Sequence, residues 1–268
     1  RADSIIADAE AIREVLLADR EDKRWSTTGQ SFGGFLTLSY LSFAPQSLRD
    51  SRITAGLAPI RTTVDNVYQH TFDRMAERNK EYYEWFPEDA VLATRIAEHL
   101  RTHEEYLPTG ERLTDHRFQM AGHYLGGRWR ERGLHYFLET AFAEGDDRLS
   151  DQFLSSMSSE VSFLANPLYA LMHETIYADG PADGTLPGIA GYELSPSPAP
   201  TNWAAARVAA QRPEFSPEAD TLFFTGEHIF PWYYEEDPAL RTLADVAQIL
   251  AEKKDWGRLY DHEQLHRN

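Results

Sequence analysis

Residues 29–34 read Gly-Gln-Ser-Phe-Gly-Gly and contain the arrangement G-x-S-x-G. A β-prone run precedes this motif at residues 24–28, and an apolar, helix-compatible run follows it at residues 35–41. Strand, tight turn and helix form the setting in which a serine hydroxyl is lifted clear of a sheet to act as a nucleophile. We therefore expect Ser31 to be a catalytic nucleophile; the alternative is a glycine-rich turn that carries a solvated serine.

The residues around Ser31 suit that chemistry. Gly29 and Gly33 are expected to remove the Cβ atoms that would collide where the strand and the helix close together. A helix that opens at Phe32 aims backbone N–H groups toward a developing oxyanion, so the Phe32 N–H is the predicted oxyanion donor.

Two glutamates are candidates for binding a cationic substrate group. Glu174 shares the face of an expected helix with apolar and aromatic side chains, including Tyr177, and Glu227 follows Gly226 at the start of an aromatic run. A carboxylate next to apolar surface needs a cationic partner. A substrate ammonium group would supply that partner to both carboxylates through charge-assisted hydrogen bonds. The alternative for each is an ordinary salt bridge to an arginine.

Aromatic side chains near these glutamates could line an apolar pocket; the main candidates are Tyr177, Phe230 and Trp232. Each could equally be a core residue. The sequence contains no metal-binding spacing such as H-E-x-x-H and no glycine-rich nucleotide motif. We therefore expect neither a metal nor a nucleotide cofactor.

The elements that must position these residues follow from the spacing of apolar residues. Helical spacing predicts a helix over residues 4–18, a second helix follows the motif to about residue 44, and the apolar run at 53–60 predicts a buried strand. Together with the strand before Ser31, these elements predict a βαβ core with parallel strands.

Beyond this core the pattern is almost entirely helical. Helices are expected at 64–86, 88–101, 115–125, 132–143, 150–162, 167–178, 202–211 and 238–254, with a glycine- and proline-rich connection at 180–200. We therefore predict three parts: an α/β core portion at residues 1–61, a helical insertion at 62–235, and a segment at 236–268 that returns toward the core.

The composition excludes several partners. The 268 residues carry a formal net charge of −17, which repels nucleic acid and anionic lipid. The sequence has no cysteine, no apolar run long enough to cross a membrane and no signal-peptide pattern at residues 1–4. We expect a cytoplasmic protein that binds neither nucleic acid nor membranes; whether it forms a homo-oligomer stays open.

Four segments carry a resemblance to a known family: residues 29–35, 166–177, 224–232 and 255–261. The sequence resembles the proline iminopeptidase family, in particular its larger bacterial subfamily. The resemblance implies an α/β-hydrolase fold, with a partial parallel sheet in this chain and a large all-α cap. It also implies a serine aminopeptidase that releases N-terminal proline from small peptides through an acyl-enzyme on Ser31, with cap glutamates, here Glu174 and Glu227, holding the substrate amine.

The sequence departs from that family at both ends. It lacks the His-Gly-Gly-Pro-Gly stretch that supplies a second oxyanion donor, and it stops before the family's catalytic Asp and His are expected. We therefore expect this chain to be an internal portion of a longer enzyme, or one chain of a split enzyme, and to be inactive by itself. Two alternatives stay open: an esterase or acyltransferase on the same scaffold, and a catalytically inactive binding protein.

Overall fold

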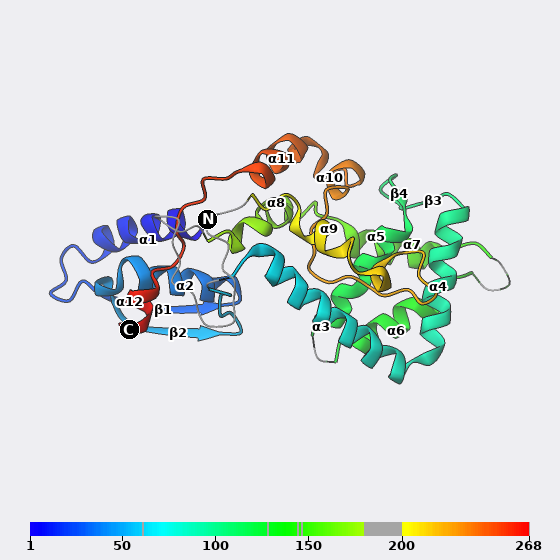
Figure 1. Cartoon of the computed structure of the whole chain (residues 1–268), viewed down its shortest axis with the longest axis horizontal. Coiled ribbons are helices and arrows are strands. Elements are labelled where there is room, and N and C mark those ends of the chain that lie inside the picture. Colours follow the sequence, from blue (N-terminus) through cyan, green and yellow to red (C-terminus); the bar gives the residue numbers. More distant parts are fainter. Residues whose placement is uncertain (61, 128, 144, 146, 180–199, 268) are drawn as a thin grey trace. The chain divides into compact units, whose positions relative to one another are not determined.

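The computed structural model describes residues 1–60, 62–127, 129–143, 145, 147–179 and 200–267 (Figure 1). They form two compact units. The first comprises Arg1–Val67, Met172–Asn202 and Ile249–Asn268, and the second comprises Tyr68–Leu171 and Trp203–Gln248, as far as these ranges are described. The connection expected at residues 180–200 lies, apart from Pro200, outside the described residues.

The first unit is built on one β-α-β motif. Strand β1 (Trp25–Gln30) pairs in parallel with β2 (Leu48–Thr54), in a register that places Gly29 beside Ile53 and Gln30 beside Thr54. Helix α2 (Phe32–Phe43) and the short 3₁₀ helix η1 (Pro45–Ser47) connect them. Helix α2 packs on both strands, and α1 (Ala2–Leu16) and α12 (His262–Arg267) pack on α2 (Figure 1). The predicted parallel βαβ core is therefore confirmed.

The position of the second strand was predicted wrongly. The apolar run at 53–60 was expected to form it, whereas the observed strand begins at Leu48 and ends at Thr54. Its middle is polar because only one face is covered: Ser51 and Ile53 are partly buried, while Arg52 and Thr54 are exposed. In a strand covered on one face, apolar and polar residues alternate along the chain. A search for a continuous apolar run, which is typical of a strand buried on both faces, therefore does not find β2.

A polar cluster joins the helices of the first unit. Arg13 donates two hydrogen bonds to the Glu10 carboxylate, both at 2.8 Å. The same carboxylate accepts hydrogen bonds from Tyr40 on α2 and from Ser47 on η1, the latter at 2.7 Å. The hydrogen bonds to Arg13, opposed by burial and supported by those to Tyr40 and Ser47, lower the pKa of Glu10 to about 2. Glu10 therefore stays ionised and ties α1 to the helix that follows Ser31.

The second unit consists almost entirely of helices. Two long helices, α3 (Val64–Trp85, which begins in the first unit) and α4 (Pro87–Thr102), are followed by a small antiparallel pair, β3 (Glu105–Tyr106) and β4 (Arg112–Leu113). The remaining helices are α5 (Asp115–Phe118), η2 (Gln119–Gly126), α6 (Glu131–Glu139), α7 (Asp151–Val161), α8 (Pro167–Met172), α9 (Ala204–Ala209), η4 (Pro213–Phe215), α10 (Tyr233–Glu236), η5 (Arg241–Leu243) and α11 (Ala244–Glu252).

Several predicted helices are shorter or divided. The helix expected at 115–125 starts as predicted, with the Thr114 side chain accepting a hydrogen bond from the Arg117 N–H, but it changes to the 3₁₀ helix η2 after Phe118. A Cβ atom at Gly122 would lie 1.8 Å from the Thr225 carbonyl oxygen. The backbone of η2 therefore meets a distant segment directly, a contact that helical spacing does not reveal.

The aromatic segment at residues 222–225 has no strand partner among the described residues, and side chains satisfy its backbone. The buried Asn79 on α3 accepts from the Phe224 N–H at 2.7 Å and donates to the Phe224 carbonyl oxygen at 2.9 Å. Gln119 donates to the Phe223 carbonyl oxygen at 2.8 Å. These bonds fix the segment that leads into Glu227.

Candidate functional site

Ser31 occupies the turn between β1 and α2, and its backbone is strained there. Its φ of 54° and ψ of −123° cost a non-glycine residue on the order of 1–3 kcal/mol. Its N–H donates to the Thr54 carbonyl oxygen at 3.1 Å, and its own carbonyl oxygen accepts from the Gly34 N–H at 2.8 Å. Strand and helix therefore both hold the turn, and Ser31 is exposed. This is the backbone setting that the G-x-S-x-G motif predicted.

Close backbone contacts explain most glycines around Ser31. A Cβ atom at Gly29 would lie 2.1 Å from the Gly33 carbonyl oxygen, and one at Gly34 would lie 1.8 Å from the Gly56 carbonyl oxygen. At Gly56 it would lie 1.9 Å from the Ser31 carbonyl oxygen. The expectation for Gly29 is thus confirmed, but that for Gly33 was wrong, because a Cβ there meets nothing within 4 Å.

Helix α2 starts directly after Ser31, with Phe32 as its first residue. No side chain caps this end of the helix. The first N–H groups of a helix have no partner within it and carry the positive end of its dipole. The Phe32 N–H therefore belongs to a helix end that can stabilise an anion next to the Ser31 hydroxyl.

The helix expected at 167–178 is divided, and the division places Glu174. Helix α8 ends at Met172, and a 3₁₀ helix, η3 (Glu174–Tyr177), begins with this glutamate. The Thr175 hydroxyl donates to the Met172 carbonyl oxygen at 2.8 Å across the junction. In a 3₁₀ helix residues three apart lie on one face, so Glu174 and Tyr177 share a face. Glu174 is buried, with 6% of its surface exposed.

Aromatic ring contacts connect η3 to the helix that follows Ser31. The Phe32 and Phe35 ring centres lie 5.9 Å apart, and Phe35 meets Tyr177 edge to face, also at 5.9 Å. Tyr177 in turn contacts the ring of His173, which precedes Glu174. The first unit therefore contains four of the predicted site residues, Ser31, Phe32, Glu174 and Tyr177, and ring contacts link α2 to η3 within it.

Glu227 belongs to the second unit and is exposed between two buried residues, Gly226 and His228. The His228 ring stacks on Phe72 at 3.8 Å, and its Nδ1 accepts a hydrogen bond from the Gly226 N–H at 3.0 Å. Its Nε2 therefore carries the proton and donates to the Thr71 hydroxyl oxygen at 3.0 Å. This anchored histidine fixes the backbone on both sides of Glu227, so the carboxylate projects from a rigid turn.

His123 on η2 interacts electrostatically with Glu227. Burial lowers the pKa of His123, while the charges of Glu227 and Glu160 and a hydrogen bond to the Gly226 backbone oppose this shift, and Arg130 supports it. The sequence motifs do not single out His123. Its nearness to Glu227 arises from tertiary packing, and no sequence spacing points to it.

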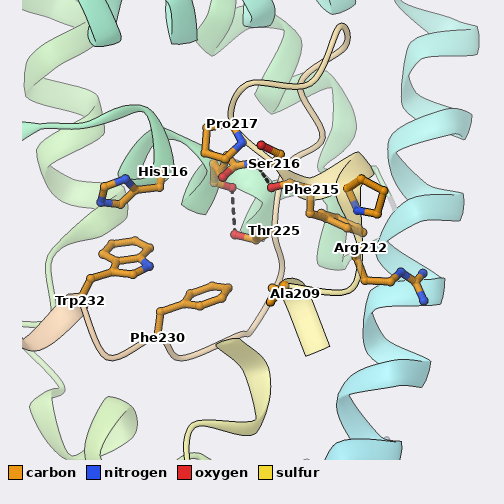
Figure 2. Close-up of a pocket in the computed structure, with 12 residues that line it drawn as sticks. His116, Ala209, Arg212, Phe215, Ser216, Pro217, Thr225, Phe230 and Trp232 are labelled. Atoms are coloured by element: carbon orange, nitrogen blue, oxygen red, sulfur yellow. Dashed lines mark hydrogen bonds between the residues drawn. The ribbon is translucent and has the colours of Figure 1, made fainter. Parts of the chain in front are cut away.

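Phe230 and Trp232 line a cavity of about 360 Å³ in the second unit (Figure 2). Their rings are stacked with centres 5.6 Å apart, and His116 meets Trp232 at 4.2 Å. In Figure 2, Phe230 reaches toward the centre of the cavity, while the Arg212 side chain points away from it. Arg212 pairs with Asp73 at 2.7 Å. The wall of the cavity therefore combines aromatic rings with small aliphatic and polar residues and one imidazole.

His116 was also missed as a member of this pocket. Burial disfavours its charge, but hydrogen bonds to Asp115 and Glu236 outweigh that effect and raise the pKa of His116 to about 9. Its Nε2 lies 2.6 Å from a Glu236 oxygen. The imidazolium is thus neutralised by its own partners, and the pocket wall that it forms with Trp232 is rigid.

The predicted pocket residues fall into both units: Tyr177 packs in the first, while Phe230 and Trp232 line the cavity of the second. Within the described ranges, no group of three or more His, Cys, Asp or Glu residues is placed to hold a metal ion. Of the helices described, none combines the length and apolarity that a membrane span requires.

Comparison with known proteins agrees with the resemblance seen in the motifs. The chain is 41% identical over its whole length to a proline iminopeptidase of Aeromonas sobria and 32% identical to one of Aspergillus aculeatus. It spans 58% and 57% of the lengths of these relatives. No protein-family model matches the chain. The resemblance to the proline iminopeptidases is confirmed.

Proposed function

We propose that this chain, a relative of the proline iminopeptidases over its whole length, supplies the nucleophile and the amine-binding side chains of a serine aminopeptidase that releases N-terminal proline. In this proposal, residues 1–61 belong to an α/β-hydrolase core, residues 62–235 form its helical cap, and residues 236–268 return to the core. The substrates are small peptides with a free N-terminal proline, and no cofactor takes part.

One observation carries the proposal: the strained, exposed Ser31 and the buried Glu174 belong to one packed unit, joined by the ring contact between Phe35 and Tyr177. A nucleophile requires an exposed hydroxyl on a rigid turn, and Ser31 provides it. A buried carboxylate attracts a cation more strongly than an exposed one, because water screens its charge less. A substrate that brings an ammonium group next to the scissile bond uses both features.

The reaction follows from these positions. The Ser31 hydroxyl attacks the carbonyl carbon of the N-terminal residue and passes its proton to a histidine base, a role that the family resemblance implies and that we assign to no described histidine. The negative oxygen is held by the Phe32 N–H. The C–N bond then breaks, the leaving amine takes up the proton, and water hydrolyses the acyl-enzyme to release proline.

Substrate selection is assigned to the cap carboxylates and aromatic rings. The proline nitrogen is a cation, and Glu174 and Glu227 would bind it through charge-assisted hydrogen bonds. The pyrrolidine ring is small and apolar, so aromatic walls such as Tyr177, Phe230 and Trp232 suit it. An endopeptidase does not need a carboxylate at this point, because its substrates carry no ammonium group at the scissile bond.

The decisive experiment compares three substrates with the full-length protein: proline β-naphthylamide, N-acetylproline β-naphthylamide and p-nitrophenyl acetate. We expect turnover of the first and loss of turnover when the amine is acetylated. Because a hydrogen bond to a charged group contributes about 1.5–3 kcal/mol, Glu174→Gln and Glu227→Gln should each lower kcat/KM for the free-amine substrate by about 10- to 100-fold. The exposed Glu235→Gln is the matched control.

The main competitor is an esterase or acyltransferase, because an exposed serine on this turn suits an ester equally well. Fast hydrolysis of p-nitrophenyl acetate, with no turnover of proline β-naphthylamide, would establish that alternative. If Ser31→Ala retains full activity toward all substrates, the nucleophile itself is assigned wrongly. A full-length protein inactive toward every substrate would instead support a binding protein.

A further inference from the structure

Asp179 lies two residues beyond η3 and connects it to a segment from the far end of the chain. Its Oδ1 accepts a hydrogen bond from the Leu259 N–H at 2.7 Å, and the Tyr260 N–H also donates to this carboxylate. Both donors are backbone groups of the stretch at residues 256–260, which we call the return segment. Asp179 is partly buried, and its own N–H donates to the Tyr177 carbonyl oxygen at 2.9 Å.

The return segment is itself anchored on the helix that follows Ser31. Leu259 and Tyr260 are buried, with 1% and 2% of their surfaces exposed, and their cluster includes three residues of α2: Phe35, Leu36 and Leu38. Helix α12, directly after this segment, also packs on α2 (Figure 1). The hydrogen bonds that Asp179 accepts from the return segment therefore restrain η3 relative to α2.

Arg1 makes a parallel connection between the same two stretches. Its guanidinium donates to the Ala178 carbonyl oxygen at 2.6 Å and to the Gly257 carbonyl oxygen at 2.8 Å, and it lies over the Trp256 ring. Burial raises the pKa of Asp179, and the two backbone N–H groups together with the charges of Arg258 and Arg1 oppose this effect. The Asp179 carboxylate is thus part of this junction, and the backbone N–H groups of Leu259 and Tyr260 are its hydrogen-bond donors.

We propose that Asp179 is a positioning residue for substrate selection: through the return segment it fixes η3, and with it the Glu174 carboxylate, relative to the turn that carries Ser31. This inference rests on the proposed function. Besides the Arg1 bridge, the described residues hold η3 on α2 through the Phe35–Tyr177 ring contact and the Asp179 junction. The ring contact allows the rings to slide, whereas hydrogen bonds to two successive N–H groups define the position of the chain.

The restraint should affect substrates unequally. Among the described residues, those of β1 and β2 and Gly56 hold the Ser31 turn, whereas the Asp179 carboxylate accepts hydrogen bonds from the return segment. Attack on a simple ester therefore does not require Asp179. Recognition of a cationic amine does require Asp179 in this proposal, because a charge-assisted hydrogen bond weakens steeply when its geometry is lost. Removing Asp179 should therefore change selectivity for the free amine and leave the chemistry at Ser31 in place.

The test measures a ratio in the full-length protein: kcat/KM for proline β-naphthylamide divided by kcat/KM for p-nitrophenyl acetate, after subtraction of the Ser31→Ala background. Both values come from the same sample, so the ratio is independent of the folded fraction. We expect Asp179→Ala to lower this ratio about tenfold, mainly through KM for the amide. Asp179→Asn keeps one acceptor oxygen, so its ratio should be close to that of the wild type.

Two comparisons distinguish positioning from a merely structural role. Asp261→Ala is the matched control, because Asp261 also accepts two backbone N–H bonds, from Glu263 and Gln264, but these lie at the start of α12 and do not reach η3. This variant should leave the ratio unchanged. In the double variant with Glu174→Gln, Asp179→Ala should add no further loss. An unchanged ratio in Asp179→Ala, or full additivity with Glu174→Gln, would overturn the inference. No turnover of proline β-naphthylamide by the wild type would instead refute the proposed function.

Discussion

Gly56 packs directly behind Ser31: a Cβ atom at position 56 would lie 1.9 Å from the Ser31 carbonyl oxygen. Gly56 follows β2, and its own carbonyl oxygen lies where a Cβ of Gly34 would be. The loop after the second strand thus forms the back of the turn that carries Ser31. Three stretches of chain meet there without side chains between them, and this contact fixes where the Ser31 hydroxyl projects.

The first prediction concerns this contact. Gly56→Ala should lower kcat/KM at least about tenfold, because the added methyl group must displace the Ser31 backbone and small misplacements of a nucleophile are costly. Gly33→Ala is the matched control, since a Cβ there meets nothing within 4 Å, and it should keep activity. Steady-state kinetics with p-nitrophenyl acetate measures both. Equal activity of the two variants would show that the turn tolerates the displacement.

The second prediction uses the lowered pKa of Glu10, which is about 2. A group whose pKa is depressed by folding stabilises the protein above its unfolded value of about 4.5, and this stabilisation is lost as the pH falls toward 2. Because the side chain is 23% exposed, we discount the shift and expect Glu10→Gln to lower the free energy of unfolding at pH 7 by about 2 kcal/mol.

Urea denaturation at several pH values checks this. The difference between wild type and Glu10→Gln should shrink as the pH falls from 4.5 toward 3. The control is Glu14→Gln on the same helix, whose carboxylate is 74% exposed and should contribute little. A difference that stays constant with pH would mean that Glu10 contributes through packing and not through its charge.

The third prediction concerns His116, whose pKa is raised to about 9. A raised pKa means that the charged form stabilises the fold; this contribution is complete below pH 6.5 and is lost as the pH rises through 9. Since about a third of the side chain is exposed, its discounted contribution is about 1–2 kcal/mol. His116→Gln should therefore be less stable than the wild type at pH 6 and nearly equal to it at pH 10.

Denaturation curves at these two pH values decide the matter, with the exposed His70→Gln as control. Because His116 also packs against Trp232, His116→Gln should additionally weaken binding of proline β-naphthylamide. Equal destabilisation at both pH values would contradict a charge effect and point to lost packing alone.

The fourth prediction links His123 to substrate affinity. Burial lowers the pKa of His123, so this residue is neutral at pH 7 and becomes charged only as the pH falls below its usual value of 6.5. A cation there would compensate Glu227 and compete with the substrate ammonium. KM for proline β-naphthylamide should therefore rise on the acidic side, and this rise should be smaller in His123→Gln. Parallel KM profiles for wild type and variant would rule out the coupling.

Local chemistry made part of this protein predictable. The motif around Ser31 depends on neighbours along the chain: glycine permits close approach, a serine follows a β-prone run, and an apolar helix begins at once. The helix starts at Thr114 and Ser150 were predictable for the same reason, because a capping side chain bonds to an N–H three residues away. The candidate glutamates stood out by their apolar surroundings in the sequence.

Other features depend on contacts between distant residues. The second strand was placed too late because Leu48–Thr54 is covered on one face only. Helix 167–178 divides after Met172, where η3 meets α2 through Tyr177 and Phe35. The nearness of His123 to Glu227 and of Asp179 to Leu259 likewise has no local signature.

The turn at Ser31, the parallel βαβ unit and the residue types proposed to bind the amine were predictable from the amino-acid sequence, because these follow from sterics and hydrogen bonds within a few residues. Which glycine packs behind Ser31, which residues share a unit with Glu174 and what holds them there depend on the folded structure. These contacts form only when folding brings residues that are distant in the sequence close together. Neither the periodicity of apolar residues nor the spacing of a motif indicates which distant residue will be the partner.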